Sequence, residues 1–260
     1  MRDPVRISPG TTPPPRWWAP PARPVRRGRC VWLCALEGGR DAVTTRVPAA
    51  ESSVPLRHLH TGSTTEREEQ RLARAVVDID AAPLRVFAPV ALTLRELAVQ
   101  ARRLHGEQAL RLLAVDGPDE LLLAAGRPRA GEGAEVLRAL RRLARGLQIP
   151  VVATAALDQS RAPDRRPAPT DLRESDGVLR TADLVLLLHR TDAYRQRIPL
   201  AGEAELTLAK HRRGLTGRLV IAHQGHRGRF VDVPDGPRFS AHGAEEAIED
   251  GVADTTPKDG

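Results

Sequence analysis

An aspartate and two charged bends are the parts of this sequence whose residue types could do chemistry. Asp116 follows the apolar run 110–115, and carboxylates that hold metal-bound phosphates stand at the ends of buried parallel strands. The bend 170–175 reads Thr-Asp-Leu-Arg-Glu-Ser, and the bend 209–217 reads Ala-Lys-His-Arg-Arg-Gly-Leu-Thr-Gly. Charged loops between apolar strands predict a phosphate or nucleic-acid site at the edge of a parallel sheet. For Asp116 alone a simple turn is the competing interpretation, because many strands end in Asp-Gly.

Short apolar runs predict the strands that would position these residues. They are typical of buried strands, and the continuous run 184–188 predicts burial on both faces of a sheet. From residue 204 the pattern becomes all β, with glycine-rich turns that predict antiparallel hairpins. The expected strands are 30–36, 84–87, 110–115, 149–154, 184–188, 204–210, 217–223 and 228–232.

Three segments have the periodicity of helices. Thr65 with Glu68 predicts an N-cap for a helix over 65–77, and Thr93-Leu94-Arg95-Glu96 is a capping box that opens a helix to about Leu104. The third helix, 131–148, has an apolar stripe, and its arginines lie largely off that stripe. The stripe is Val136, Leu140, Leu143 and Leu147, and the arginines are Arg138, Arg141, Arg142 and Arg145.

Composition limits the number of domains and the kind of partner. At 260 residues the chain is long enough for one sizeable α/β domain between disordered tails, which we place at 1–29 (rich in Pro and Arg) and 236–260 (acidic). The formal charge of +7 and the pI of about 10.6 favour an acidic partner, with nucleic acid first. The alternative is a GC-rich genome that encodes arginine freely. Charge alone leaves both open.

Cysteine use and hydropathy indicate the compartment. Cys30 and Cys34 are the only cysteines, and their spacing places both on one face of a strand, which favours buried thiols over a metal pair. Two cysteines give no disulfide framework, as expected in a reducing compartment. No apolar run reaches the roughly 18 residues of a membrane helix and no secretory signal opens the chain, so we expect a cytoplasmic protein without membrane contact.

From Cys30 to Val233, about four-fifths of the chain, the order of motifs resembles the C-terminal RecA-like motor domain of DnaB-type replicative DNA helicases. Residues 33–37, Leu-Cys-Ala-Leu-Glu, are similar to the family's Ser-Leu-Glu-Met, and 112–116 to its Walker B strand. Residues 165–175 are close to the family's Lys-Arg-Pro…Asp-Leu-Arg-Glu-Ser, and 210–217 to Lys-Gln-Arg-Asn-Gly-Pro-Thr-Gly. The resemblance implies a RecA-like, P-loop NTPase-type α/β fold over 30–235, mostly parallel, with C-terminal antiparallel hairpins.

The resemblance also implies roles for matching residues in ATP hydrolysis. Glu37 corresponds to the glutamate that polarises the attacking water, and Asp116 to the carboxylate that holds magnesium on the phosphates through water. Lys210 and Arg212 correspond to finger residues that stabilise transition-state charge at the nucleotide of a neighbouring subunit. The implied cofactors are therefore ATP and magnesium, and the implied assembly is a homo- or hetero-hexameric helicase ring.

For DNA, the resemblance implies that Arg173 and Glu174 lie in the loop that lines the central pore and follows the single-stranded backbone. An arginine there neutralises phosphate whatever the base sequence, as a translocating motor needs. A surface ion pair that contributes little is the alternative for these two residues.

The sequence departs from the family where phosphate is bound. No lysine precedes Lys210, so the Walker A loop Gly-x-x-x-x-Gly-Lys-Thr/Ser is absent from these residues together with its strand. The expected nucleotide-sensing glutamine is Ala156, and the glycine after the Asp-Leu-Arg-Glu-Ser motif is Asp176. Loss of the Walker A strand, which is central in the RecA sheet, would leave two neighbouring strands with unpaired backbone groups.

Three interpretations remain open at this point, and whether the chain is itself an enzyme depends on which holds. The chain is a helicase motor domain, impaired in ATP hydrolysis by the missing loop. Alternatively it is a non-enzymatic, degenerate paralogue that binds single-stranded DNA or docks on an intact helicase ring. The third interpretation is a truncated gene model of an active helicase.

Overall fold

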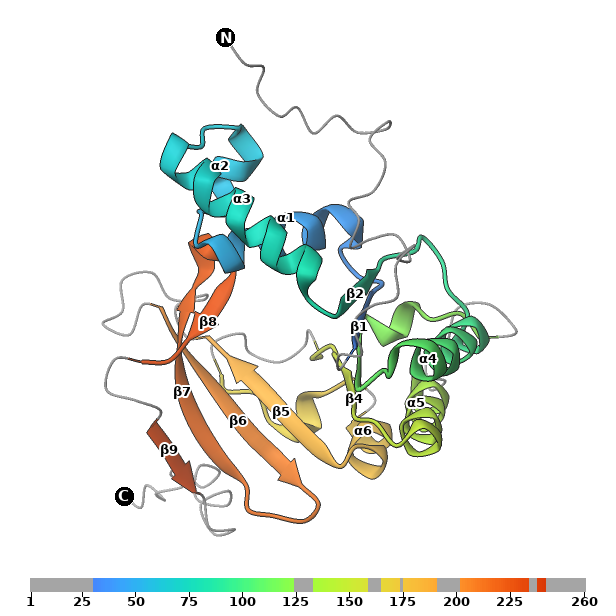
Figure 1. Cartoon of the computed structure of the whole chain (residues 1–260). Coiled ribbons are helices and arrows are strands. Elements are labelled where there is room, and N and C mark those ends of the chain that lie inside the picture. The colour runs from blue at the N-terminus through green and yellow to red at the C-terminus, as the bar shows by residue number, and fades with distance from the viewer. Residues whose placement is uncertain are drawn as a thin grey trace, which may run out of the picture. The chain divides into compact units, whose positions relative to one another are not determined.

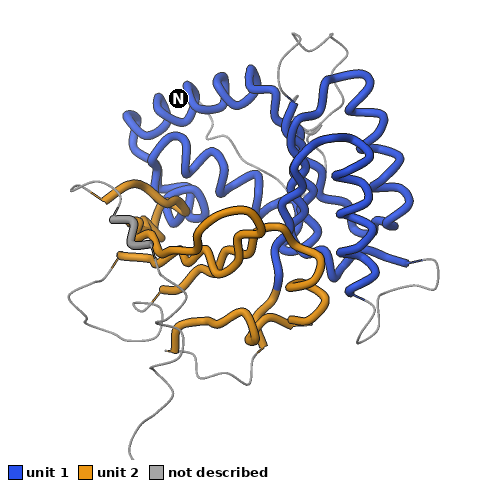
Figure 2. Tube along the Cα trace, turned by 90° about the horizontal axis from the view of Figure 1, so that it is seen from below, with its two compact units in different colours: residues 1–155 blue, residues 156–260 orange. Residues whose placement is uncertain are grey.

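The computed structural model places the chain in two compact units, residues 1–155 and residues 156–260 (Figure 2). The predicted tail 1–29 lies outside the residues that the structure describes, as does most of the predicted tail 236–260. The described residues are 30–123, 133–158, 165–173, 175–190, 202–233 and, for the backbone, 238–241.

The first unit is built on a parallel sheet with the strand order β2-β1-β3-β4 (Figure 1). In the pairing of β1 with β3, Ala35 lies opposite Asp116, so the two strands end together. The carboxyl ends of neighbouring strands therefore meet at one edge. The strands are β1 (Val31–Ala35), β2 (Leu84–Phe87), β3 (Leu112–Asp116) and β4 (Val151–Ala153).

Two helices of the first unit, α3 and α4, begin where the capping residues predict. Thr65 and Thr93 both form complete capping boxes, in which the threonine oxygen accepts from the backbone N–H of Glu68 or Glu96 and the glutamate accepts from the threonine N–H. The elements are α1 (Gly39–Ser52), α2 (Leu56–Thr61), α3 (Glu66–Ala81), α4 (Leu94–Gln108), the 3-10 turn η1 (Pro118–Glu120) and α5 (Gly133–Leu147).

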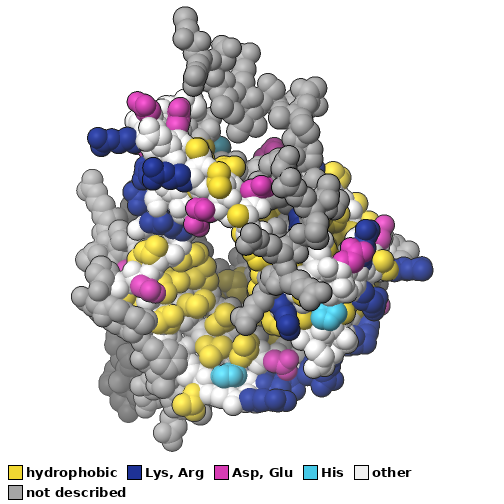
Figure 3. Space-filling view, in the orientation of Figure 1, with side chains coloured by type: hydrophobic (Ala, Val, Ile, Leu, Met, Phe, Trp, Pro, Cys, Tyr) yellow, Lys and Arg dark blue, Asp and Glu magenta, His cyan; other side chains and the backbone are white. Residues whose placement is uncertain are grey.

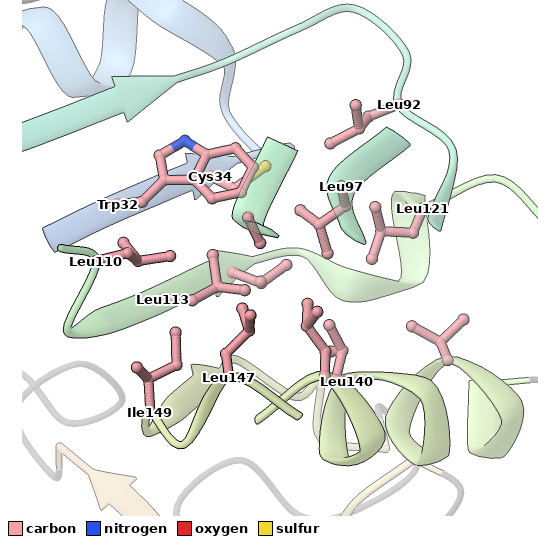
Figure 4. Packing of buried hydrophobic residues seen from close by; sticks show 14 of the residues in the cluster. Trp32, Cys34, Leu92, Leu97, Leu110, Leu113, Leu121, Leu140, Leu147 and Ile149 are labelled. Atoms are coloured by element: carbon pink, nitrogen blue, oxygen red, sulfur yellow. The ribbon is translucent and has the colours of Figure 1, made fainter. Parts of the chain in front are cut away.

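The core of this unit lies between the sheet and α4 and α5 (Figure 4). Alternate residues of β1 point to opposite faces, so Trp32 and Cys34 pack into this core while Leu33 packs with Val86 and Ile79 on the other face. The predicted stripe of α5 is buried in full. Burial raises the pKa of the Cys34 thiol to about 12, so the two cysteines are core residues, as their spacing predicts.

Helix α1 is absent from the sequence-based expectations, and its residues explain why. Gly38 and Gly39, at its N-cap and first position, are typical of a turn, its N-cap has no side-chain hydrogen bond, and Pro48 lies inside it. Pro48 and Ala49 are buried, so packing of their side chains stabilises the helix instead. Tertiary packing stabilises this helix where local signals oppose it.

The second unit contains an antiparallel sheet with the order β5-β6-β7-β8, and β9 also pairs with β7. The three predicted hairpin strands are confirmed. Strand β9 lies inside the segment 236–260 that the sequence predicts to be a tail, and its four residues pair with β7. The elements are η2 (Pro169–Asp171), α6 (Ser175–Thr181), β5 (Leu184–His189), β6 (Glu203–His211), β7 (Gly217–Gln224), η4 (Gly225–Arg227), β8 (Arg229–Val231) and β9 (Arg238–Ala241).

The prediction that residues 184–188 are buried on both faces is wrong. Strand β5 alternates, with Val185 and Leu187 buried while Leu184, Leu186 and Leu188 are 53%, 57% and 43% exposed. The reason is its position at the edge of its sheet, paired only with β6 among the described strands. β4 is likewise an edge strand of the parallel sheet. The predicted α/β class with antiparallel hairpins is confirmed, but the two kinds of pairing form separate sheets.

Among the described residues, the structure has no helix that is both long and apolar enough to cross a membrane.

Candidate functional site

Glu37 and Asp116, which we call the carboxylate edge, are brought together by the ends of β1 and β3. The carbonyl oxygen of Asp116 accepts from the N–H of Leu36 at 2.9 Å and of Glu37 at 3.3 Å. Gly117 makes this approach possible, because a Cβ there would lie 2.8 Å from the Glu37 Cβ. Its φ of +75° is also one that other residues rarely adopt.

The side chains of the carboxylate edge are available to a ligand. Glu37 is exposed and Asp116 partly exposed, and neither side chain has a hydrogen bond or an ion pair among the residues that the structure describes. No cluster of three His, Cys, Asp or Glu side chains in that part of the chain could hold a metal by itself. Magnesium is commonly held by one or two carboxylates together with substrate phosphates and water, so these oxygen donors fit that ion.

Thr154 belongs to the same edge, and sequence reasoning missed it. Its hydroxyl accepts from the N–H of Gly117 at 2.8 Å, and its own N–H donates to the carbonyl oxygen of Val115 at 3.1 Å. These bonds fix the turn after β3 and hence the position of Asp116. The available signal was its place at the end of the strand predicted over 149–154, beside the Asp116 strand in a parallel sheet.

Lys210 and Arg212, with the C-terminal end of α6, form what we call the basic corner of the second unit. The Lys210 ammonium donates to the carbonyl oxygens of Leu179 and Ala182, the latter at 2.8 Å. Arg212 forms an ion pair with Asp183 at 2.7 Å. Cations are favoured at the C-terminal end of a helix, where the last carbonyls lack partners. Both candidate finger residues are therefore engaged within their own chain.

Arg173 lies exposed in the turn between η2 and α6. Its backbone N–H donates to the carbonyl oxygen of Ala156 at 2.9 Å, and the neighbouring Leu172 is buried and bridged to Leu157. The backbone is thus fixed while the guanidinium reaches solvent. Glu174 lies outside the described residues. Asp176, the departure from the family pattern, is exposed in the first turn of α6.

An arginine of the same motif ties this loop to the sheet of the second unit. Arg166 donates twice to Glu205 of β6, at 2.8 Å each, and Arg218 lies 3.5 Å from the same carboxylate. The hydrogen bonds from Arg166 hold the pKa of Glu205 below its ordinary value.

Comparison with known proteins decides the family. The family model described as "DnaB-like helicase C terminal domain" matches residues 22–232, and so spans both units. The chain belongs to this family. The sequence motifs predicted this family and its RecA-like fold, and the comparison confirms both.

Curated relatives of this DnaB-like chain are replicative helicases. It is 38% identical over 204 residues to the replicative DNA helicase DnaB of Leifsonia xyli subsp. xyli, covering 76% of this chain and 44% of the relative. It is 38% identical over 206 residues to that of Mycobacterium leprae, covering 77% and 34%. The chain thus spans less than half the length of these relatives.

Solved structures support the fold of the DnaB-like domain. A structure described as an ATPase domain superposes with a TM-score of 0.72 at 24% identity, covering 79% of this chain and 75% of that one. A structure described as that of a DnaB-like replicative helicase and its interactions with primase gives 0.73 at 24% identity, covering 79% and 51%. At this identity the likeness concerns fold alone.

Proposed function

We propose that residues 30–235 act as one RecA-like motor domain of a replicative helicase, which uses ATP to move along single-stranded DNA and separate a duplex. The observation that carries this proposal is the carboxylate edge, where Glu37 and Asp116 end neighbouring parallel strands in a chain of the DnaB-like family. Ligands of open α/β sheets bind at the carboxyl ends of strands.

In this proposal the carboxylate edge is one half of a nucleotide site. Asp116 would help to hold magnesium, and Glu37 would accept a proton from the water that attacks the terminal phosphate. The ion would neutralise charge on the phosphates. The other half is the phosphate cradle, and these 260 residues contain no Gly-x-x-x-x-Gly-Lys to form it. We therefore expect this chain alone to hydrolyse ATP very poorly.

DNA contact is assigned to the exposed turn of the second unit. Arg173 would neutralise a phosphate of the single strand, with Glu174 beside it in the same loop. The fixed backbone at Leu172 supports this role, because an anchored turn presents the guanidinium without ordering a long loop on binding.

We assign the basic corner to contact with a neighbouring subunit. The subunits would form a hexameric ring, which we expect in the cytoplasm. In such a ring Lys210 and Arg212 would reach the neighbour's nucleotide and stabilise transition-state charge. Arg212 must first leave Asp183, and the cost is small because both side chains are well exposed. Lys210 must leave the carbonyl oxygens of Leu179 in α6 and of Ala182 directly after it, which costs more.

ATP turnover and DNA binding test the proposal separately. Purified protein at micromolar concentration is assayed for ATP hydrolysis with magnesium, and for binding of a labelled oligothymidylate by fluorescence anisotropy. We expect no saturable turnover by the chain alone, and DNA binding that weakens in Arg173→Gln. Turnover like that of an ordinary helicase would contradict the assigned impairment, and equal DNA binding by wild type and variant would contradict the role of Arg173.

A non-enzymatic role in the ring of an intact helicase is a second candidate function. It is favoured by Lys210 and Arg212, since fingers act on a neighbour's nucleotide and need no phosphate cradle of their own. The chain is mixed with an intact DnaB-type helicase and assayed for co-purification and ATP turnover. Arg212→Gln should lower turnover of the mixture without preventing assembly, whereas a chain that never co-purifies excludes this function.

The truncated-gene interpretation has a direct test that needs no protein. The nucleotide sequence upstream of the first codon is translated in all frames. A Gly-x-x-x-x-Gly-Lys motif followed by an uninterrupted frame into residue 1 would support this interpretation, and stop codons in every frame would exclude it.

A further inference from the structure

The outer face of α5 carries four arginines, and the three exposed ones, Arg138, Arg142 and Arg145, form what we call the arginine ridge. Their spacing of four and seven residues places all three on one side of the helix. The opposite side is the buried stripe, so the rotation of the helix is fixed by the core. Dark-blue side chains gather over the region of α4 and α5 in the space-filling view (Figure 3).

The charge of the ridge is not neutralised by its surroundings. Arg138, Arg142 and Arg145 are exposed, and no hydrogen bond or ion pair engages their side chains in the described part of the chain. The single acidic residue of α5 is Glu135, in its first turn. On α4, by contrast, Arg103 is paired with Glu107 at 2.9 Å. The ridge therefore presents an unopposed positive stripe to solvent.

Phosphate is the anion that this stripe fits. Every cation is a guanidinium, whose planar donors match phosphate oxygens in pairs, and none is a lysine. At 1.5 Å of rise per residue, Arg138 and Arg145 are about 10 Å apart along the axis. Duplex DNA carries about six phosphates in that length, so several ridge arginines can each face a phosphate.

An acidic protein fits the ridge less well than a nucleic acid. Stable protein interfaces have an apolar core, and the arginines enriched in them accompany aromatic and other apolar side chains. Several large hydrophobic side chains are exposed in the described chain, but none of them lies on α5. A protein docked here would bury arginines without an apolar centre. Phosphate contacts need no such centre, because release of counterions drives binding.

We propose that the arginine ridge binds the phosphodiester backbone of a nucleic acid strand, independently of sequence and separately from Arg173. The ridge belongs to the first unit and Arg173 to the second, and they are carried by different elements. The chain thus has two nucleic-acid contacts, of which the ridge requires neither nucleotide nor a neighbouring subunit.

Helix α3 offers a matched control for this proposal. Arg67, Arg71 and Arg74 are exposed with the same spacing of four and seven residues as Arg138, Arg142 and Arg145, and they line a shallow hollow with Gln70. The first turn of α3 has three acidic residues where that of α5 has one, and Arg71 lies 3.9 Å from Glu68. Replacing either set by glutamine removes the same charge from an exposed helix face.

The test measures binding of labelled oligothymidylate and of a labelled duplex by the full chain at several salt concentrations. The triple variant R138Q/R142Q/R145Q should bind at least one form more than tenfold more weakly. Its slope of log affinity against log salt should fall by about 2, since each lost phosphate contact contributes about 0.7 for a single strand. The variant R67Q/R71Q/R74Q should keep its slope within about 0.5 of wild type.

Two outcomes would overturn the ridge proposal. One is unchanged binding of both DNA forms by the ridge variant, and the other is an equal loss in both triple variants, which would indicate net charge alone. Circular dichroism checks that each variant is folded. If a triple variant does not fold, the single variant R142Q replaces it, with an expected change in slope of about 0.7. Arg173→Gln is measured in parallel, so failure at the ridge and failure at the assigned DNA loop are distinguishable.

Discussion

The carboxylate edge and the basic corner carry the candidate chemistry of the two units, and they are held in opposite ways. Glu37 and Asp116 are positioned by backbone pairing between β1 and β3, and their side chains make no bonds among the described residues. Lys210 and Arg212 are positioned by their own side chains, which bind carbonyl oxygens and a carboxylate at the end of α6.

This difference determines which of the two sites can bind a ligand without first breaking an interaction of its own. A side chain placed by its backbone can bind a ligand without giving up an existing interaction, so the carboxylate edge is preorganised. A side chain held by its own hydrogen bonds must break them first. The basic corner can therefore act on a neighbour only after α6 loses part of its C-terminal capping, whereas the carboxylate edge needs only the rest of its site.

The largest effect is expected from Gly117→Ala, which disturbs the backbone placement of the carboxylate edge. The new Cβ would lie 2.8 Å from the Glu37 Cβ and 3.0 Å from its N, at a φ of +75°. We expect a loss of about 2–4 kcal/mol in the free energy of unfolding, from overpacking and from the left-handed backbone together. Urea denaturation followed by circular dichroism measures it.

Gly62→Ala is the matched control for this substitution. Gly62 has a φ of +67° but nothing within 4 Å of a Cβ, so it has the backbone cost alone, about 1 kcal/mol. An equal loss in both variants would show that contact with Glu37 contributes nothing, and would contradict the tight placement of the carboxylate edge.

A smaller effect is expected from Lys210→Met, which removes the ammonium from the end of α6. Two carbonyl oxygens lose a charged donor, so the free energy of unfolding should fall by about 2 kcal/mol. Hydrogen exchange should quicken in α6. Arg212→Gln removes an exposed ion pair and should cost less than about 1 kcal/mol. If Lys210→Met lowers the free energy of unfolding no more than Arg212→Gln does, the hydrogen bonds of Lys210 do not stabilise the end of α6.

The smallest effect is the acid dependence of the pair that ties the 165–173 loop to β6. Because hydrogen bonds from Arg166 lower the pKa of Glu205 in the folded protein, ionised Glu205 contributes stability at pH above its ordinary value of 4.5. That contribution disappears as the pH falls through the lower folded pKa. Glu205→Gln should therefore cost about 1 kcal/mol at pH 7, and this difference from wild type should vanish in acid.

Glu203→Gln on the same strand is the control, because Glu203 has no ion pair in the described part of the chain. Thermal unfolding of the three proteins from pH 7 to pH 3 checks the prediction. A difference between wild type and Glu205→Gln that stays the same from pH 7 to pH 3 would show that the Arg166 pair is not its source.

The sequence by itself determined the elements with local signals. Two threonine–glutamate boxes set the starts of α3 and α4, and the stripe of α5 identified its buried face, since both depend on contacts a few residues apart. Motif order also determined the family and the candidate residues, including Glu37 and Asp116, and the glycine-rich turns separated the hairpin strands of the second unit.

Only the tertiary structure decided what depends on neighbours distant in sequence. It formed α1 despite Pro48, added β9 to the β7 ladder and left one face of β5 exposed, because packing and strand pairing override local preference. It also placed Thr154 beside Gly117 and turned Lys210 back onto α6. Charge pattern names the residues that can bind a phosphate, but the fold determines which of them are free to do so.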